Sequence, residues 1–206
     1  MQWEVLATDK AIDKTIGALN ANGFDALVVE TGEDAKKKVL EIIPKHAEVM
    51  PMTSVTLDTI GVSQAINDSG DYDSVRNKLN TMNREKQSSE MQKIGAAPEW
   101  AIGSVHAITE DGKVLIASNT GSQLPAYVYG SSHVIWIVGT QKIVSNVADA
   151  TTRIYDYVLP LETKRARKAY NLPDTFHSNV SKLLIINKEL VPHRITLIFV
   201  KEKFGY

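Results

Sequence analysis

The sequence predicts an α/β fold in which a mostly parallel sheet is covered by helices on both faces. Two observations support this prediction. The first 66 residues alternate between helix-type and strand-type patterns, an alternation typical of parallel strands joined by crossover helices. The segment HVIWIVG (His133–Gly139) is apolar at nearly every position. A strand buried on both faces needs that composition, so we expect 134–138 at the centre of the sheet.

The elements of the first half follow from hydrophobic spacing and from helix end signals. Thr8 or Asp9 can cap the first helix, and Gly23 can end it. Thr31 and Asp34 have the spacing of a capping box before the second helix. Two short apolar runs predict buried strands. The expected order is helix 9–22, strand 24–29, helix 35–43, strand 47–50 and helix 56–66.

Residues 67–100 are polar and poorly periodic, with only a weak apolar stripe at Met82, Met91 and Ile94. We expect helix and loop structure that is loosely attached to the core. An exposed connection is the simpler interpretation, and a lid over a site is the alternative.

Regular patterns return in the second half. Strands are expected at 105–108 and 114–117, because they flank the turn pair Asp111-Gly112. A short helix can run from Pro125 to Gly130. Asn146 and Asp149 can cap a further helix, which is interrupted near Pro160 and continues to 170. Two more strands, 182–186 and 195–200, are expected to close the sheet. We interpret 1–206 as one domain, with 1–23 as an N-terminal helical extension and 67–100 as an insertion.

Composition excludes several classes of function. The 23 basic and 24 acidic residues give no excess charge for binding nucleic acid. The chain has no cysteine, which excludes disulfides and cysteine-ligated zinc or iron–sulfur clusters, and no HxH or HExxH spacing indicates a metal site. No apolar run approaches roughly 18 residues and no signal pattern opens the chain, so we expect a cytoplasmic protein without membrane contact, intrinsic metal or cofactor.

Three polar loops follow predicted strands, after Met50, Ala117 and Val138. Ligands of open parallel sheets bind beyond the carboxyl ends of the strands, where these loops should meet. The loops supply hydroxyl groups, flexible glycines and one cation. We also expect the backbone N–H groups near 120–122 to face an anion, although each loop could instead be an ordinary helix cap. The predicted ligand-binding residues are Thr53, Ser54, Thr56, Asn119, Thr120, Gly121, Ser122, Gly139 and Lys142.

Several segments together resemble a known family. They are MTSVTLDTIGV, the long stretch from GSVHAITEDGKVLIASNTG through VGTQKIV to ATTRI, and the terminal FVKEKFGY. These segments resemble the lactate-utilisation (LUD) domain family, of the lactate utilisation protein C type, formerly a domain of unknown function. The resemblance implies a three-layer αβα fold like that of sugar-phosphate isomerases, glucosamine-phosphate deaminases and CoA-transferases. It also implies an association with lactate oxidation alongside iron–sulfur oxidoreductase subunits.

The sequence departs from relatives of this family at two places. Asn119 stands where some relatives have an acidic residue, and 171–184 lacks the cysteine cluster of others. Three functions therefore stay open: a small-anion-binding or accessory component of organic-acid oxidation, an autonomous enzyme acting on a sugar phosphate or acyl-CoA, and a structural subunit for iron–sulfur partners. An enzyme would need a general base, for which Asp58 and Glu30 are the nearest candidates. Self-association is also left open.

Overall fold

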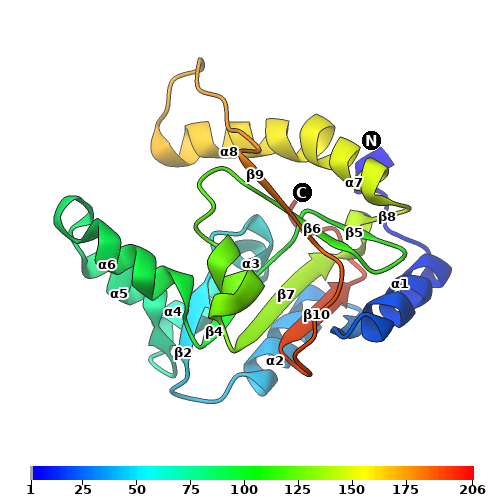
Figure 1. The fold of residues 1–206 in the computed structure, drawn as a ribbon, viewed down its shortest axis with the longest axis horizontal. Coiled ribbons are helices and arrows are strands. Elements are labelled where there is room, and N and C mark those ends of the chain that lie inside the picture. Colours follow the sequence, from blue (N-terminus) through cyan, green and yellow to red (C-terminus); the bar gives the residue numbers. More distant parts are fainter. Residues whose placement is uncertain (1) are drawn as a thin grey trace.

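In the computed structural model, which describes residues 2–206, a six-stranded sheet forms the centre of the molecule (Figure 1). Every strand pair in it is parallel, which confirms the predicted fold class. The strands, in spatial order, are β1 (Asp25–Val29), β10 (Ile195–Val200), β7 (His133–Gly139), β4 (Trp100–Gly103), β2 (Glu48–Pro51) and β3 (Asp73–Ser74).

Strand β7 lies inside this sheet, between β10 and β4, as its composition predicts. Its side chains alternate between two hydrophobic cores. Val134, Trp136 and Val138 pack on one side of the sheet, and Ile135 and Ile137 pack on the other. An alternating polar pattern would leave one of these cores incomplete, so the continuous apolar run is required by burial on both faces.

Three helices cover one face of the sheet: α2 (Gly32–Ile42), α3 (Val55–Ile60) and α4 (Val62–Asp68). The predicted capping box is present, because the Thr31 side chain accepts from the Asp34 N–H and the Asp34 carboxylate accepts from the Thr31 N–H. The single helix predicted over 56–66 is wrong. Gly61 adopts φ 78°, a left-handed conformation that ends α3 and starts α4.

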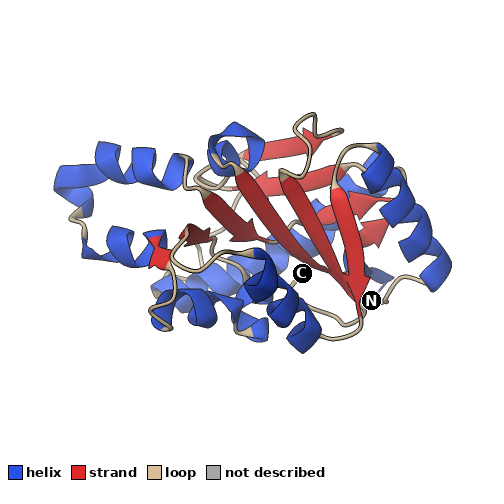
Figure 2. Ribbon diagram, turned by 90° about the horizontal axis from the view of Figure 1, so that it is seen from below, coloured by secondary structure: helices blue, strands red, loops and turns tan. Residues whose placement is uncertain are grey.

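The other face is covered by α1 (Asp9–Ala21) and by a second sheet (Figure 2). The second sheet has the order β8-β5-β6-β9, formed by Ile143–Val144, Ala107–Thr109, Val114–Ser118 and Lys182–Ile186. The prediction that 182–186 and 195–200 close one sheet is therefore wrong. Strand β9 belongs to the second sheet, and β10 lies inside the first because it is apolar on both faces. Strand β1 is at the edge and only half-buried, not fully buried as expected.

The segment 67–100 forms β3 and two helices, α5 (Val75–Thr81) and α6 (Arg84–Ala96), which project from the body as an arm (Figures 1 and 2). We use "the arm" for residues 75–96. Its outer helix α6 has no buried residue, and Gln87 departs from helical geometry near its start. The arm thus has little of its surface committed to the core.

A long helical stretch packs over the second sheet. Helix α7 (Val147–Arg153) begins at the predicted cap Asn146, continues through a π-helical segment (Ile154–Val158), and leads directly into α8 (Leu159–Tyr170). The predicted interruption near Pro160 is wrong. Pro160 instead lies in the first turn of α8, where its missing N–H costs least.

Two neighbouring strands of the first sheet continue into the second sheet side by side. After β4 the chain passes through 104–106 into β5, and after β7 it passes through a 3₁₀ turn (Thr140–Lys142) into β8. Because β4 pairs with β7 and β5 pairs with β8, the two crossings lie next to each other. No helix within residues 2–206 is long and apolar enough to cross a membrane.

Candidate functional site

The crossing segments place a buried lysine at the seam between the two sheets. Lys142 ends the 3₁₀ turn after β7 and is only 2% exposed. Its ammonium nitrogen, Nζ, lies 3.1 Å from Ser104 Oγ and 3.1 Å from the carbonyl oxygen of Val105, both on the neighbouring crossing segment. Thr56 Oγ1 lies 3.5 Å away. We call these four residues the floor.

The floor carries positive charge without a carboxylate partner. Burial, with the nearby Arg153 guanidinium adding repulsion, lowers the pKa of Lys142 to about 7. Arg153 is fully buried and donates from Nη1 to the carbonyl of His106 at 2.5 Å. Its Nε and Nη2 groups have no hydrogen-bond partner in residues 2–206. Burial lowers the Arg153 pKa to about 10, so its charge persists at neutral pH.

His106 feels the charge of both basic groups and stays neutral. Burial, then Lys142, then Arg153 lower its pKa to about 3. Its Nδ1 must therefore accept a hydrogen bond, and it does so from the Ala117 N–H at 3.1 Å. This agrees with the sequence interpretation of His106 as a structural residue, although its ring also lines the cleft described next.

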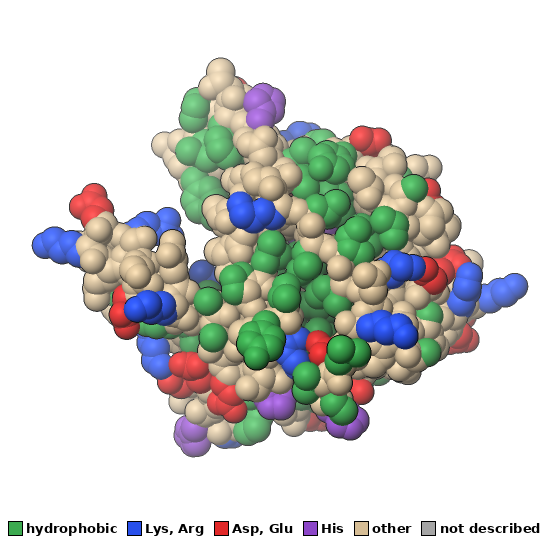
Figure 3. All heavy atoms as spheres, viewed as in Figure 1, with side chains coloured by type: hydrophobic (Ala, Val, Ile, Leu, Met, Phe, Trp, Pro, Cys, Tyr) green, Lys and Arg blue, Asp and Glu red, His purple; other side chains and the backbone are tan. Residues whose placement is uncertain are grey.

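The floor lies at the base of an open cleft of about 1000 Å³. Figure 3 shows the surface hollowed between the arm, at the left, and the projection formed by the end of α8 and the loop after it, at the top. The cleft lining includes eight of the nine predicted ligand-binding residues: Thr53, Ser54, Thr56, Asn119, Thr120, Gly121, Ser122 and Lys142. Gly139 does not line it. A side chain there would meet the Glu202 carbonyl at 2.7 Å, so this glycine permits close backbone packing.

The loop 118–123, which we call the rim loop, is held together by its own hydrogen bonds. The Gly121 N–H donates to Ser118 Oγ at 2.8 Å, and the Ser122 N–H donates to Thr120 Oγ1 at 3.3 Å. The expectation that these two amides are available to an anion is therefore wrong. Ser118 and Thr120 occupy them, because serine and threonine hydroxyls compete readily for nearby backbone groups. What the rim loop presents is its exposed side chains, Asn119 among them.

The C-terminal segment closes the cleft beside the floor. The Phe204 carbonyl accepts from Gln141 Nε2 at 2.9 Å and from Thr56 Oγ1 at 3.4 Å. Gly205 has φ 61°, and a Cβ added there would lie 2.5 Å from Thr56 Oγ1 and 3.4 Å from Lys142 Nζ. Glycine at this position therefore lets the C-terminal segment pack closely against Thr56 and the amine.

Comparison with known proteins identifies the family. A sequence model described as the LUD domain matches residues 12–200. The chain belongs to the LUD domain family. The crystal structure of a DUF162 family protein from Deinococcus radiodurans, DUF162 being the former name of this domain, has a similar fold. That likeness has a TM-score of 0.57 at 10% sequence identity and covers 95% of this chain and 99% of that one. No curated protein matches the sequence.

Two carboxylates line the cleft of this LUD domain, and each has a partner. Asp58 accepts from Ser63 Oγ at 2.7 Å. Glu162 accepts two bonds from Arg165, both at 2.7 Å, and one from the Tyr206 hydroxyl at 2.8 Å. Glu30, the other predicted candidate base, lies outside the cleft and pairs with Lys201 at 3.1 Å. Sequence reasoning missed Glu162 and Tyr206, although Tyr206 ends the FVKEKFGY segment that belongs to the family resemblance.

The arm adds two arginines to the cleft lining. Arg76 donates from Nη2 to the Pro51 carbonyl at 2.8 Å, which fixes it at the carboxyl end of β2. Burial lowers the Arg76 pKa, and neighbouring Tyr170 and Asp58 oppose that effect. Arg84 is exposed. Neither arginine stands out in the sequence, because the weak periodicity of 67–100 gives no indication of which side faces the sheet.

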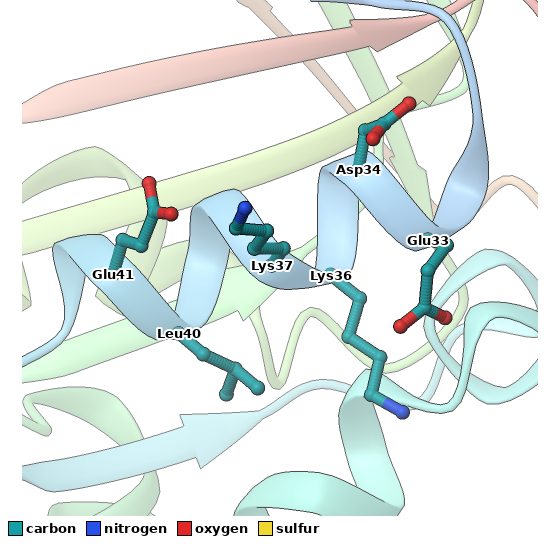
Figure 4. A pocket seen from close by; sticks show the side chains of 6 residues that line it. All are labelled: Glu33, Asp34, Lys36, Lys37, Leu40 and Glu41. Atoms are coloured by element: carbon teal, nitrogen blue, oxygen red, sulfur yellow. The ribbon is translucent and has the colours of Figure 1, made fainter.

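A smaller hollow of about 400 Å³ lies elsewhere, on the outer surface of α2 (Figure 4). All six residues that line it come from that one helix, and their side chains extend to two different sides of it. Nothing there converges on a common point, so it is a helix surface and not a binding site. In the described part of the chain, no group of three histidine or acidic side chains could hold a metal ion.

Proposed function

We propose that this LUD domain binds a small organic anion in the cleft, with Lys142 as its charge partner. In this role it would serve as a ligand-binding or accessory component of organic-acid oxidation, lactate oxidation being the process associated with the family. One observation supports the proposal most: the buried Lys142 lines the open cleft, and within residues 2–206 its amine contacts a carbonyl and two hydroxyls but no carboxylate.

The energetics favour an anionic ligand over a structural role for the lysine. A buried charge is costly unless it is paired, and the partners of Lys142 are a carbonyl and two hydroxyls. A carboxylate or phosphate oxygen next to Nζ would raise the lysine pKa and form a charge-assisted hydrogen bond, typically worth about 1.5–3 kcal/mol. Binding should therefore be strongest below pH 7, where the ammonium form prevails without ligand.

The arm supports a role in enclosing the ligand. Its residues Arg76, Leu79 and Met91 line the cleft opposite the rim loop. We propose that the arm acts as a lid, the second of the two interpretations that the sequence leaves open. Exposed apolar side chains elsewhere, such as Leu190 and Tyr129, are candidate contacts for iron–sulfur subunits or a second copy.

The test is a thermal-shift screen of organic acids, sugar phosphates, nucleotides and CoA esters. A ligand at about 100 times its dissociation constant adds about 2.7 kcal/mol, which is a measurable shift. Lys142→Met keeps most of the apolar side chain and removes the charge, so it should weaken binding roughly tenfold or more.

Lys182→Met is the matched control, because Lys182 is exposed and its side chain lies against Gly121 of the rim loop, outside the cleft lining. This variant should bind as the unmodified protein does. Equal binding by the Lys142→Met variant would rule out the proposed charge partner. If no compound in the screen shifts the unfolding temperature, the structural-subunit alternative becomes the better interpretation.

One observation favours catalysis as a second candidate function. The cleft holds an amine with a pKa near neutrality together with the carboxylates Asp58 and Glu162. Such perturbed groups gather at active sites. Turnover of any ligand found in the screen, followed by nuclear magnetic resonance of the mixture, would distinguish an enzyme from a binding component.

A further inference from the structure

We propose that Lys142 captures an oxo acid covalently, as an imine between its Nζ and the ketone carbon of the acid. This inference rests on the proposed function, since the oxo acid would first be held as an anion in the same cleft. It adds an electrophilic carbonyl group to the description of the ligand and a nucleophilic role to the lysine.

The contacts of Nζ suit a neutral amine as well as an ammonium group. The Val105 carbonyl can only accept, so it takes one N–H. The hydroxyls of Ser104 and Thr56 can each donate or accept. A neutral amine, with two N–H groups and one lone pair, can therefore donate to the carbonyl and one hydroxyl while accepting from the other. No contact obliges the nitrogen to stay protonated.

The surroundings favour the neutral, nucleophilic form. Lys142 is 2% exposed, and the adjacent basic group is the fully buried Arg153. A lysine that is desolvated or placed next to another cation is the usual arrangement for a nucleophilic amine. With a pKa of about 7, about half of the molecules carry the free amine at neutral pH.

The nitrogen also has access to a ligand. Lys142 lines the cleft together with Ser104, whose hydroxyl lies 3.1 Å from Nζ. Met52, Val105 and Tyr127 line the same cavity and are buried. Their apolar surfaces limit the water that would hydrolyse an imine.

The chemistry balances without an oxidant or a metal. The lone pair on Nζ forms a bond to the ketone carbon, and the carbonyl oxygen becomes a hydroxyl group. That oxygen then leaves as water, carrying one proton from Nζ and one from solvent. The Ser104 hydroxyl, 3.1 Å from Nζ, relays the solvent proton. The product is a cationic iminium next to the carboxylate of the acid. The carboxylate of the acid therefore keeps its favourable contact with the positive charge of the site. A neutral ketone has no such contact, so the site selects oxo acids over neutral ketones.

The experiment uses pyruvate and lactate as a matched pair, because they share size and charge and differ in the carbonyl group. The full chain is incubated with each acid, reduced with cyanoborohydride, and mapped by mass spectrometry after proteolysis. With pyruvate we expect an adduct, equal in mass to the acid less water plus two hydrogens, on the peptide containing Lys142. Its yield should exceed that on any exposed lysine at least tenfold. Lactate should give none.

Two variants localise the reaction. Lys142→Met should lose the adduct, and Lys182→Met should keep it. Thermal shifts measured in parallel separate this inference from the proposed function. If either acid stabilises the protein but pyruvate leaves no adduct on Lys142, covalent capture is overturned and anion binding stands. An adduct spread evenly over exposed lysines would also overturn it. If neither acid nor any other anion stabilises the protein, the proposed function fails with it.

Discussion

The floor and the arm form opposite parts of one cleft, and they differ in how firmly the fold holds them. Lys142, Val105 and Thr56 are buried, and their contacts join segments 37 and 86 residues apart. The arm ends in a helix with no buried residue. The charge that would recognise a ligand is therefore held by buried residues. Within the arm only Val75 is buried, so the surface that would enclose a ligand is held less firmly. Local stability in proteins is generally divided in this way between scaffolds and lids.

The largest effect should come from truncating the core beneath the floor. Trp136 is fully buried in β7 and packs edge-on against Tyr127, with ring centres 5.4 Å apart. Trp136→Ala should lower the free energy of unfolding by about 3–5 kcal/mol, because it leaves a large cavity. Urea denaturation would measure it. A loss below about 1 kcal/mol would show that the floor is no more firmly held than the arm.

A smaller effect on the free energy of unfolding is expected at Gly205, where an added side chain would also change the lining of the cleft. Gly205→Ala places a methyl group 2.5 Å from Thr56 Oγ1 in a backbone conformation that disfavours side chains. We expect a loss of about 1–3 kcal/mol and a markedly weaker response to ligand. Unfolding and ligand titration of the same variant would test both. The matched control is Gly17→Ala, since nothing lies within 4 Å of a Cβ at Gly17.

The buried lysine should give a pH-dependent signature of the floor. The folded pKa of Lys142 is lowered from 10.5 to about 7, so between these values the unfolded chain holds a proton that the folded chain lacks. Stability therefore rises with pH across this window, by up to roughly 1.4 kcal/mol per pH unit. Lys142→Met should remove this rise. Parallel pH profiles of the two proteins would contradict the assignment.

The smallest change in stability is expected in the arm. Met91 lines the cleft from α6 and is only partly buried. Met91→Ala should change the free energy of unfolding by less than about 0.5 kcal/mol, yet raise the dissociation constant of a bound ligand about two- to fivefold. Calorimetric titration would measure it. A variant that loses much stability but no affinity would show that the arm is part of the scaffold.

The same contrast explains how much the sequence could predict. The run HVIWIVG predicted a central strand, because that signal is local in sequence and burial on both faces is a strong constraint. The expectation that the three polar loops leave one edge of a parallel sheet is wrong, because β2 and β7 lie in the first sheet whereas β6 is an antiparallel strand of the second. The second sheet could not be predicted, since pairing β6 with β9 depends on residues about 64 positions apart, as Ser118 and Lys182 are. The prediction that the rim-loop amides are available to an anion was wrong. The hydroxyl side chains that accept hydrogen bonds from these amides are of the same type that a ligand site would use.

Lys142 shows the limit of motif reasoning. Its position after a strand predicted a cation at the cleft, and the structure places it there. Its altered pKa could not be predicted, because that depends on burial and on Arg153, which follows on a different helix. Glu162 and Tyr206 were missed for a similar reason: they meet only after α8 and the C-terminal segment fold against each other.

The position of β10 has a consequence for the growing chain on the ribosome. Among residues 2–206, strand β1 pairs with β10 and with no other strand, Asp25 lying opposite Thr196. Residues 25–29 therefore have no partner until 195–200 emerge, a delay on the order of ten seconds at typical rates of translation. During that time the run ALVV is exposed in an incomplete chain. We expect nascent chains shorter than about 200 residues to depend on chaperones and to become protease-resistant only once β10 is released.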